Sequence, residues 1–186
     1  MAETHEGHVP EINLLGLPGA LRAGSSNRML LRNAARIMGD VTYVEADLHL
    51  PLYDGDLEDR GIPAPVQTLA DQIAAADCVV ISTPEYNKNL SGVLKNALDW
   101  VSRVEGNPWK GKPVALMAAA SGRAGGERAL NSLVLAMMPF RADLVYGPEV
   151  CVADGRNQFD DAGLLINGRV EKSLGLLMAK LRAAGG

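Results

Sequence analysis

Short apolar runs alternate with segments of helical spacing along this chain, and the alternation limits the possible folds more than any other feature. The clearest run, residues 78–82, reads Cys-Val-Val-Ile-Ser and is apolar on both faces. A segment after the first apolar run shows the contrasting pattern, because Leu30, Ala34 and Ile37 share the spacing of one helix face. Strands of this kind, separated by helices, form a parallel sheet that helices cover on both sides.

Five such strand and helix units fit within the 186 residues. They predict an α/β fold of the flavodoxin-like type, with a doubly wound, five-stranded parallel sheet of strand order 2-1-3-4-5. Residues 11–186 are predicted to form this single domain, and the polar, acidic residues 1–10 a mobile N-terminal tail. The predicted strands are 12–17, 41–46, 77–83, 113–120 and 142–152, the last interrupted near Gly147, and the predicted helices are 28–38, 66–76, 94–104, 127–138 and 163–182, with an irregular connection over 47–63.

In this strand order the winding reverses between strands one and three, so the loops after these two strands border the ligand site. The loop after the first strand contains Arg22, Ser25, Ser26 and Asn27 and leads into a helix. Side-chain donors next to the free N–H groups of a helix start predict a phosphate site. The glycine spacing matches neither the dinucleotide fingerprint nor the P-loop, and a plain capped helix start is the alternative.

The loop after the third strand holds Pro84, Glu85, Tyr86 and Asn87 and then enters another helix. Proline fixes the backbone there, while the acid, the phenol and the amide supply an aromatic edge and several hydrogen-bonding groups. This combination predicts a site for a flat heterocycle.

With both loops considered, the chain resembles the NAD(P)H-dependent FMN reductase family, a flavodoxin-like group that includes bacterial quinone and chromate reductases and azoreductase-like enzymes. The resemblance covers residues 12–181, and two motifs in the right order, each after its own strand, make it specific. The residues that carry it are Gly19, Leu21, Arg22, Gly24, Ser25 and Asn27 in the first loop, Thr83, Pro84, Glu85, Tyr86 and Asn87 in the second, and the run 92–100 (GVLKNALDW) in the helix that follows.

The resemblance implies a noncovalently bound FMN, and one phosphate beside one heterocycle indicates FMN rather than a dinucleotide. Three loops are implied to bind it. Their residues are Arg22, Ser25, Ser26 and Asn27 at the phosphate, Pro84, Glu85, Tyr86 and Asn87 along the isoalloxazine and ribityl groups, and Ser121, Gly122, Arg123 and Gly125 on the other side of the ring.

The chemistry implied by the resemblance is a ping-pong cycle, in which hydride passes from NADH or NADPH to FMN and then to a second substrate at the same place. No catalytic acid or base is required of the protein, so no catalytic residue is expected. Arg123 is the candidate positive charge near the reduced flavin, and a solvated side chain or a subunit contact is its alternative.

Four further residues are each considered separately. Ala20 stands where the family often has serine, and Lys88 occupies a segment that lacks the family's frequent glycine. Trp100 is predicted to pack in the core or in an interface. Trp109, in a turn rich in proline and glycine, is predicted to help cover the mouth of the active site from a neighbouring subunit.

Composition limits which binding partners and which cellular compartment are expected for the protein. The net charge of −4 argues against nucleic-acid binding, and no apolar run reaches the roughly 18 residues of a membrane span. Two cysteines, Cys78 and Cys151, argue against a disulfide framework and predict a reducing cytoplasm, with Cys78 as a small buried side chain. The family resemblance implies a homodimer or homotetramer.

The electron acceptor stays open at this point, since quinones, free flavin, ferric chelates, chromate and azo dyes all accept electrons from an exposed reduced flavin. The choice between NADH and NADPH is open too. Two rival functions remain. A flavodoxin-type electron carrier would be strongly acidic and rich in aromatic residues, whereas only 4% of this chain is aromatic. A non-catalytic nucleotide-binding module would not need the loop that contains Pro84 and Asn87.

Overall fold

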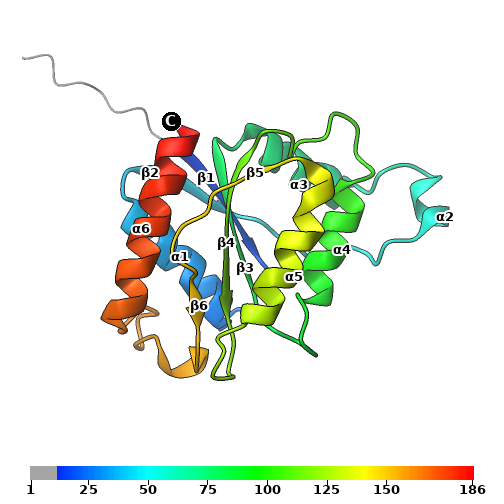
Figure 1. Cartoon of the computed structure of the whole chain (residues 1–186). Helices are drawn as coiled ribbons and strands as arrows, with labels where there is room; N and C mark the ends of the chain where they lie inside the picture. Colours follow the sequence, from blue (N-terminus) through cyan, green and yellow to red (C-terminus); the bar gives the residue numbers. More distant parts are fainter. Residues whose placement is uncertain (1–11) are drawn as a thin grey trace, which may run out of the picture.

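A computed structural model describes residues 12–186, and a parallel sheet organises them. Its strands are β1 (Ile12–Pro18), β2 (Val41–Glu45), β3 (Cys78–Thr83), β4 (Pro113–Ala119) and β5 (Asp143–Leu144), in the order β2-β1-β3-β4-β5 (Figure 1). The predicted fold class and strand order are therefore confirmed. The tail predicted for residues 1–10 lies outside the described residues.

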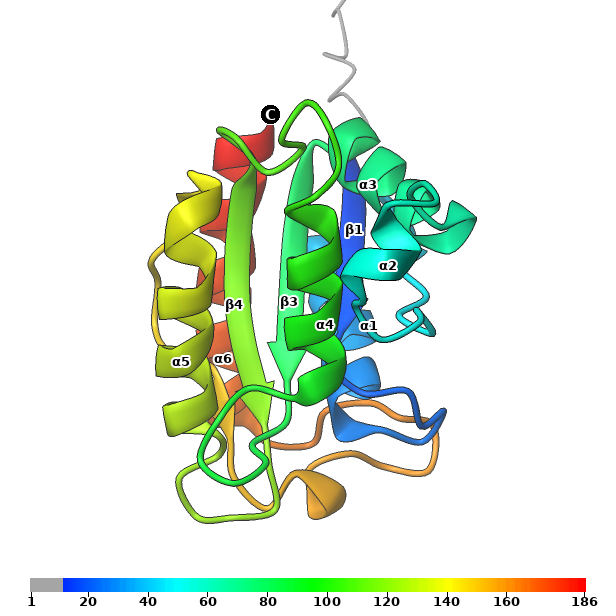
Figure 2. The ribbon, with the colours of Figure 1, turned by 90° about the vertical axis from the view of Figure 1, so that its right-hand side faces the viewer.

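Helices cover the sheet on both faces. Helices α1 (Ser26–Met38) and α6 (Gly168–Gly185) pack on one face, and α3 (Ala64–Ala75), α4 (Gly92–Val101) and α5 (Glu127–Met137) pack on the other (Figure 2). This arrangement explains the continuously apolar strands, because neighbouring residues of one strand enter different cores. In β1, Leu14 belongs to the core under α1 and α6, and Leu15 to the core under α3 and α4.

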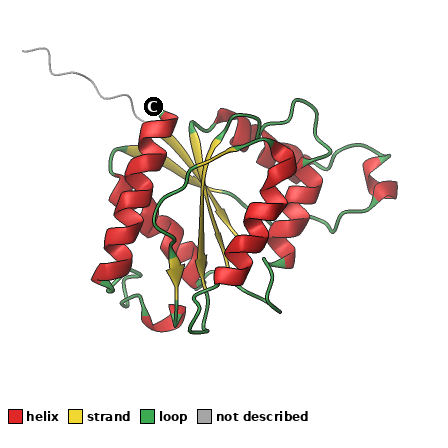
Figure 3. Ribbon diagram, in the orientation of Figure 1, coloured by secondary structure: helices red, strands yellow, loops and turns green. Residues whose placement is uncertain are grey.

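The fifth strand is split, as the interruption near Gly147 indicated. Strand β5 pairs Leu144 with Val114 of β4, and a second short strand, β6 (Cys151–Val152), pairs with β4 further along (Figure 3). Pro148 lies between them and has no N–H to give to a ladder. The 3₁₀ turns η1 (Met138–Phe140) and η2 (Gly155–Asn157) follow α5 and β6.

Several predicted elements differ from the structure, and two of the differences have a clear local cause. The connection over residues 47–63 contains a one-turn helix, α2 (Gly55–Glu58), capped by the side chain of Asp54. Helix α6 begins at Gly168 instead of residue 163, because the Asn167 side chain accepts hydrogen bonds from the N–H groups of Arg169 and Val170. None of the helices in the described part of the chain has both the length and the hydrophobicity of a membrane span.

Both tryptophans are buried. Trp100 packs in the core, and its indole N–H donates to the Pro51 carbonyl at 2.8 Å, so the core alternative predicted for it is confirmed. Trp109 is also fully buried and packs near Phe140, with ring centroids 6.1 Å apart. It directly precedes β4 and therefore lies at the amino end of the sheet. The predicted role of Trp109 at an active-site mouth was wrong, because that role requires an exposed residue at the opposite end.

Candidate functional site

A pocket of about 540 Å³ opens at the carboxyl ends of the strands, where the switch point of the sheet lies. Loops after β1, β3, β4 and β6 line it, and eight of the twelve predicted site residues take part. The lining residues are Gly19, Ala20, Leu21, Arg22, Ser25, Ser26, Asn27, Pro84, Glu85, Tyr86, Ser91, Gly92, Val93, Ala119, Ala120, Ser121, Gly155 and Arg156.

One end of the pocket is the start of α1. The Ser25 hydroxyl caps this helix by accepting a hydrogen bond from the Asn27 N–H at 3.2 Å. Within residues 12–186, the side chains of Arg22 and Ser26 form no hydrogen bond or ion pair. Arg22 and Ser26 are therefore available donors beside the N–H groups of a helix start, the arrangement that binds a phosphate.

Asn27 has an additional, structural task. Its side chain is 2% exposed and links α1 to two strands. The amide oxygen accepts from the Ser82 hydroxyl at 2.8 Å and from the Ala119 N–H at 3.0 Å, and the amide NH₂ donates to the Ala119 carbonyl at 2.9 Å. Because the amide is committed to the sheet, Asn27 positions the helix start more than it offers donors to a ligand.

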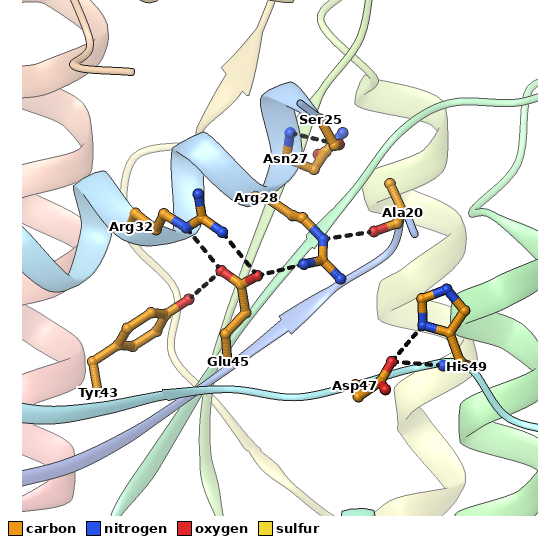
Figure 4. A network of polar contacts seen from close by, with 9 residues as sticks. All are labelled: Ala20, Ser25, Asn27, Arg28, Arg32, Tyr43, Glu45, Asp47 and His49. Carbon is orange, nitrogen blue, oxygen red and sulfur yellow. Dashed lines mark hydrogen bonds and ion pairs between the residues drawn. The ribbon is translucent and has the colours of Figure 1, made fainter. Parts of the chain in front are cut away.

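An ion-pair network also holds the loop between β1 and α1 (Figure 4). The Arg28 guanidinium donates to the Ala20 carbonyl at 3.2 Å and to the Glu45 carboxylate at 2.9 Å. Glu45 also pairs with Arg32 at 3.2 Å and accepts from the Tyr43 hydroxyl at 3.3 Å. Burial, together with Glu45, raises the pKa of Tyr43, so the phenol stays a hydrogen-bond donor. The network fixes the backbone of the pocket loop at Ala20.

The other end of the pocket is the loop after β3. The Thr83 hydroxyl accepts from the Ser91 N–H at 3.2 Å, which ties the two ends of this loop together. At its tip, Tyr86 and Asn89 exchange two backbone hydrogen bonds of 3.1 Å. The two residues between them, Asn87 and Lys88, have positive φ angles of 52° and 65°. This is a tight primed turn, and Asn87 is not among the residues that line the pocket.

Glu85 and Tyr86 face the pocket in different ways. The Glu85 side chain is 17% exposed, and its Oε1 lies 3.6 Å from the Arg128 guanidinium. Its Oε2 is buried and has no hydrogen-bond partner within the described residues. Tyr86 is 61% exposed. A buried carboxylate oxygen in a pocket wall needs a donor, which a ligand N–H supplies.

The loop after β4 contributes less than expected. Ser121 lines the pocket, whereas Gly122 and Arg123 are exposed and lie outside the lining. Gly125 has a φ of 64°, and a Cβ there would lie 2.6 Å from the Cys151 carbonyl. Glycine is thus required at 125 for packing against β6, which gives that residue a structural role away from the pocket.

Sequence reasoning missed Gly155 and Arg156, which line the pocket from the η2 turn. The predicted fifth strand ended at Val152 and the next predicted helix began at residue 163, so the segment between them was left without a role. A signal was present, because a loop that follows a parallel strand lies at the same edge as the other ligand loops.

The two cysteines are structural. Burial raises the pKa of Cys151 to about 11, with the carboxylates of Glu149, Glu127 and Glu85 adding to the effect. Burial and Asp77 likewise raise the pKa of Cys78 to about 11. A raised pKa disfavours the thiolate at neutral pH, which argues against a nucleophilic role for either cysteine.

Comparison with known proteins decides the family. The model of the NADPH-dependent FMN reductase family matches residues 12–157. The chain belongs to the NADPH-dependent FMN reductase family. It is an FMN-dependent NAD(P)H oxidoreductase, as the resemblance of its two loops implied.

Relatives within this family cover nearly the whole chain. An NAD(P)H-dependent FMN reductase of Pseudomonas aeruginosa is 37% identical over 175 residues, which cover 93% of each chain. A quinone reductase of Escherichia coli is 38% identical over 154 residues, covering 81% of this chain and 82% of the relative. Among solved structures, the flavoenzyme NAD(P)H:(acceptor) oxidoreductase FerB of Paracoccus denitrificans superposes with a TM-score of 0.84 at 26% identity, covering 94% of this chain and 97% of FerB.

The pocket fits the cofactor of the FMN reductase family. Unpaired donors at the α1 start suit the phosphate, and the orphaned Glu85 oxygen suits an N–H of the ring. Gly19 lets the end of β1 pack closely against β3, because a Cβ there would lie 3.0 Å from the Ser82 carbonyl oxygen. Donors at one end and a buried acceptor at the other match the phosphate and the ring of an elongated flavin with one phosphate.

Proposed function

We propose that this protein passes hydride from NADH or NADPH to quinones and related small-molecule acceptors through FMN held in the switch-point pocket. One observation carries the proposal. A single pocket combines Arg22 and Ser26, whose side chains can donate hydrogen bonds to a phosphate, with an exposed loop at Tyr86. The names of relatives support quinones as the acceptor class. The relative from Escherichia coli is a quinone reductase, and the relative from Oryza sativa is a probable NADPH:quinone oxidoreductase.

FMN, when bound, supplies the two-electron hydride chemistry. The protein supplies orientation. Arg22, Ser25, Ser26 and the α1 start hold the phosphate, while the buried oxygen of Glu85 accepts a hydrogen bond from a ring N–H. No side chain is needed as an acid or base, because the flavin supplies the hydride chemistry and the protein holds the reacting groups in place.

The loop after β3, which in this proposal borders the flavin ring and is called the ring end, leaves room for substrates to enter and leave. Tyr86 and Asn87 are exposed, and Arg123 is exposed on the loop after β4. In this proposal Tyr86 and Asn87 border the ring, Gly122 lets backbone approach it, and Arg123 meets an anionic group of the nucleotide. An accessible ring face of this kind distinguishes a reductase from an electron carrier, which encloses its flavin.

The proposed assembly is a homodimer or homotetramer in the cytoplasm. Several large apolar side chains on and around α5 support an interface. The exposed ones are Leu135, Met138 and Tyr146, with 67%, 68% and 71% of their surfaces open. The two unpaired thiols agree with a reducing compartment.

The test is spectroscopic. Purified protein reconstituted with FMN is expected to be yellow, and NADH or NADPH should bleach it without oxygen. Added benzoquinone should then restore the colour in a second, separate step. A colourless protein that binds no added FMN would contradict the proposal, and a bound flavin that neither nucleotide reduces would favour the electron carrier. Steady-state kinetics with both nucleotides and a panel of acceptors then rank quinones against chromate, ferric chelates and azo dyes.

A further inference from the structure

We infer that Arg156 is a second arginine of the FMN phosphate site, supplied by the turn after β6. The inference deepens the proposed function and rests on it. It assigns a role to the segment 153–157, which no motif of the sequence covers.

The η2 turn is attached directly to the phosphate end of the pocket. The Gly155 N–H donates to the Ala120 carbonyl at 3.0 Å, which joins the turn to the end of β4. A Cβ on Gly155 would lie 3.4 Å from the Ser26 hydroxyl oxygen, so the turn also packs against the first residue of α1. Figure 2 shows this turn at the carboxyl edge of the sheet, with the other pocket loops. Arg156 follows Gly155 and lines the same pocket as Ser26.

The turn is internally fixed in a way that leaves the arginine free. Asp154 has a φ of 49°, and both of its carboxylate oxygens accept from the Asn157 amide, at 3.1 and 3.0 Å. The Asn157 N–H donates to the Asp154 carbonyl at 2.9 Å. The carboxylate nearest in sequence is thus already engaged. Within residues 12–186, Arg156 makes no hydrogen bond or ion pair of its own.

The charges on the pocket wall favour a dianion. Arg22 and Arg156 bring two guanidinium groups from segments far apart in the sequence. The carboxylate that lines the pocket, Glu85, belongs to the opposite loop and lies beside Arg128. A phosphate with two negative charges matches two planar guanidinium donors and the N–H groups of a helix start. Arg156 would then make the pocket select FMN over riboflavin, which lacks the phosphate.

The experiment measures binding to the apoprotein by quenching of flavin fluorescence, with FMN and riboflavin as paired ligands. Arg156→Ala should raise the Kd for FMN about tenfold and leave the Kd for riboflavin unchanged, because a charge-assisted hydrogen bond to phosphate is lost. Arg156→Lys should recover part of the affinity. Arg22→Ala is expected to behave like Arg156→Ala, and the double variant should approach the affinity for riboflavin.

Arg60→Ala is the matched control, since Arg60 is exposed and lies outside the pocket lining. It should change neither Kd. An unchanged FMN affinity of Arg156→Ala, beside a weakened Arg22→Ala, would overturn the inference and leave the proposed function standing. The inference is also overturned if Arg156→Ala alters only the KM for NADPH, because its phosphate partner is then the nucleotide. Wild-type protein that binds no FMN would refute the proposed function itself.

Discussion

The two ends of the pocket are built by opposite means. At the phosphate end, Asn27 is 2% exposed and forms three hydrogen bonds to β3 and β4, and Arg28 holds the Ala20 carbonyl. At the ring end, Tyr86 is 61% exposed and Lys88 has a φ of 65°. One end is cross-linked to the sheet, and the other is a strained, solvated turn.

This difference corresponds to two binding tasks. A cofactor that stays bound gains affinity from groups that are already in place, because little ordering is needed when it enters. Substrates that replace one another need an end that is accessible and tolerant of shape. The contrast therefore predicts that substitutions at the phosphate end change stability and FMN affinity, whereas those at the ring end change substrate kinetics.

The largest effect is expected at Asn27. Asn27→Ala removes three buried hydrogen bonds and leaves the Ser82 hydroxyl and both backbone groups of Ala119 without partners. We expect the free energy of unfolding to fall by about 3 kcal/mol, measured by urea denaturation. Asn87→Ala is the matched control in the exposed turn and should cost about 1 kcal/mol or less. An equal loss of unfolding free energy in the two variants would show that the two ends of the pocket do not differ in this way.

A smaller effect is expected at Glu45. Its carboxylate is 15% exposed and holds Arg28 and Arg32, so Glu45→Gln should lower the free energy of unfolding by about 1–2 kcal/mol. The loop at Ala20 should also loosen, which raises the Kd for FMN several-fold. Glu58→Gln is the control, because Glu58 pairs with Arg103 away from the pocket. It should leave the FMN affinity unchanged, and a change as large as that of Glu45→Gln would show that the network does not act on the loop.

Much of this architecture was predictable from the sequence. Continuous apolar strands that alternate with helical segments predict the strand order seen in the structure, and the order fixes where the loops after β1 and β3 meet. The predicted pocket residues from Arg22 to Asn27 and from Pro84 to Tyr86 do line one pocket. The strand order is confirmed, and the grouping of these residues follows from it, because both depend on local pattern and on a topology that few alternatives satisfy.

The remainder depends on contacts between segments distant in sequence, which a local pattern does not contain. Asn27 was predicted to face the ligand, yet its partners Ser82 and Ala119 are identified only when three elements are packed together. Gly125 owes its identity to the carbonyl of Cys151, and Trp109 to its burial near Phe140. Arg156 was missed because the segment after the predicted fifth strand carries no local motif, and its place beside α1 appears only when β6 pairs with β4.

At the ring end, Tyr86→Ala should separate binding from turnover. Because the Tyr86 ring is exposed at the edge of the pocket, its removal should change the free energy of unfolding by about 0.5 kcal/mol or less and the Kd for FMN little. The KM for benzoquinone should rise several-fold, since the aromatic edge that borders the acceptor is lost. Stopped-flow reduction and steady-state kinetics measure the two effects. A large loss of FMN affinity would place Tyr86 with the cofactor-holding groups instead.

The last prediction concerns the turn at Lys88, where the strain of the backbone is testable. Lys88→Gly relieves a φ of 65° that side chains rarely adopt, and the free energy of unfolding should rise by about 0.5–1 kcal/mol. Lys88→Ala also removes the charge but keeps the strained backbone, so it should not stabilise the protein. If both variants are equally stabilised, the charge of Lys88 is responsible. If only Lys88→Gly is more stable and its kcat/KM for NADPH falls, the strained turn serves substrate binding, because stability has been given up there for the shape of the ring end.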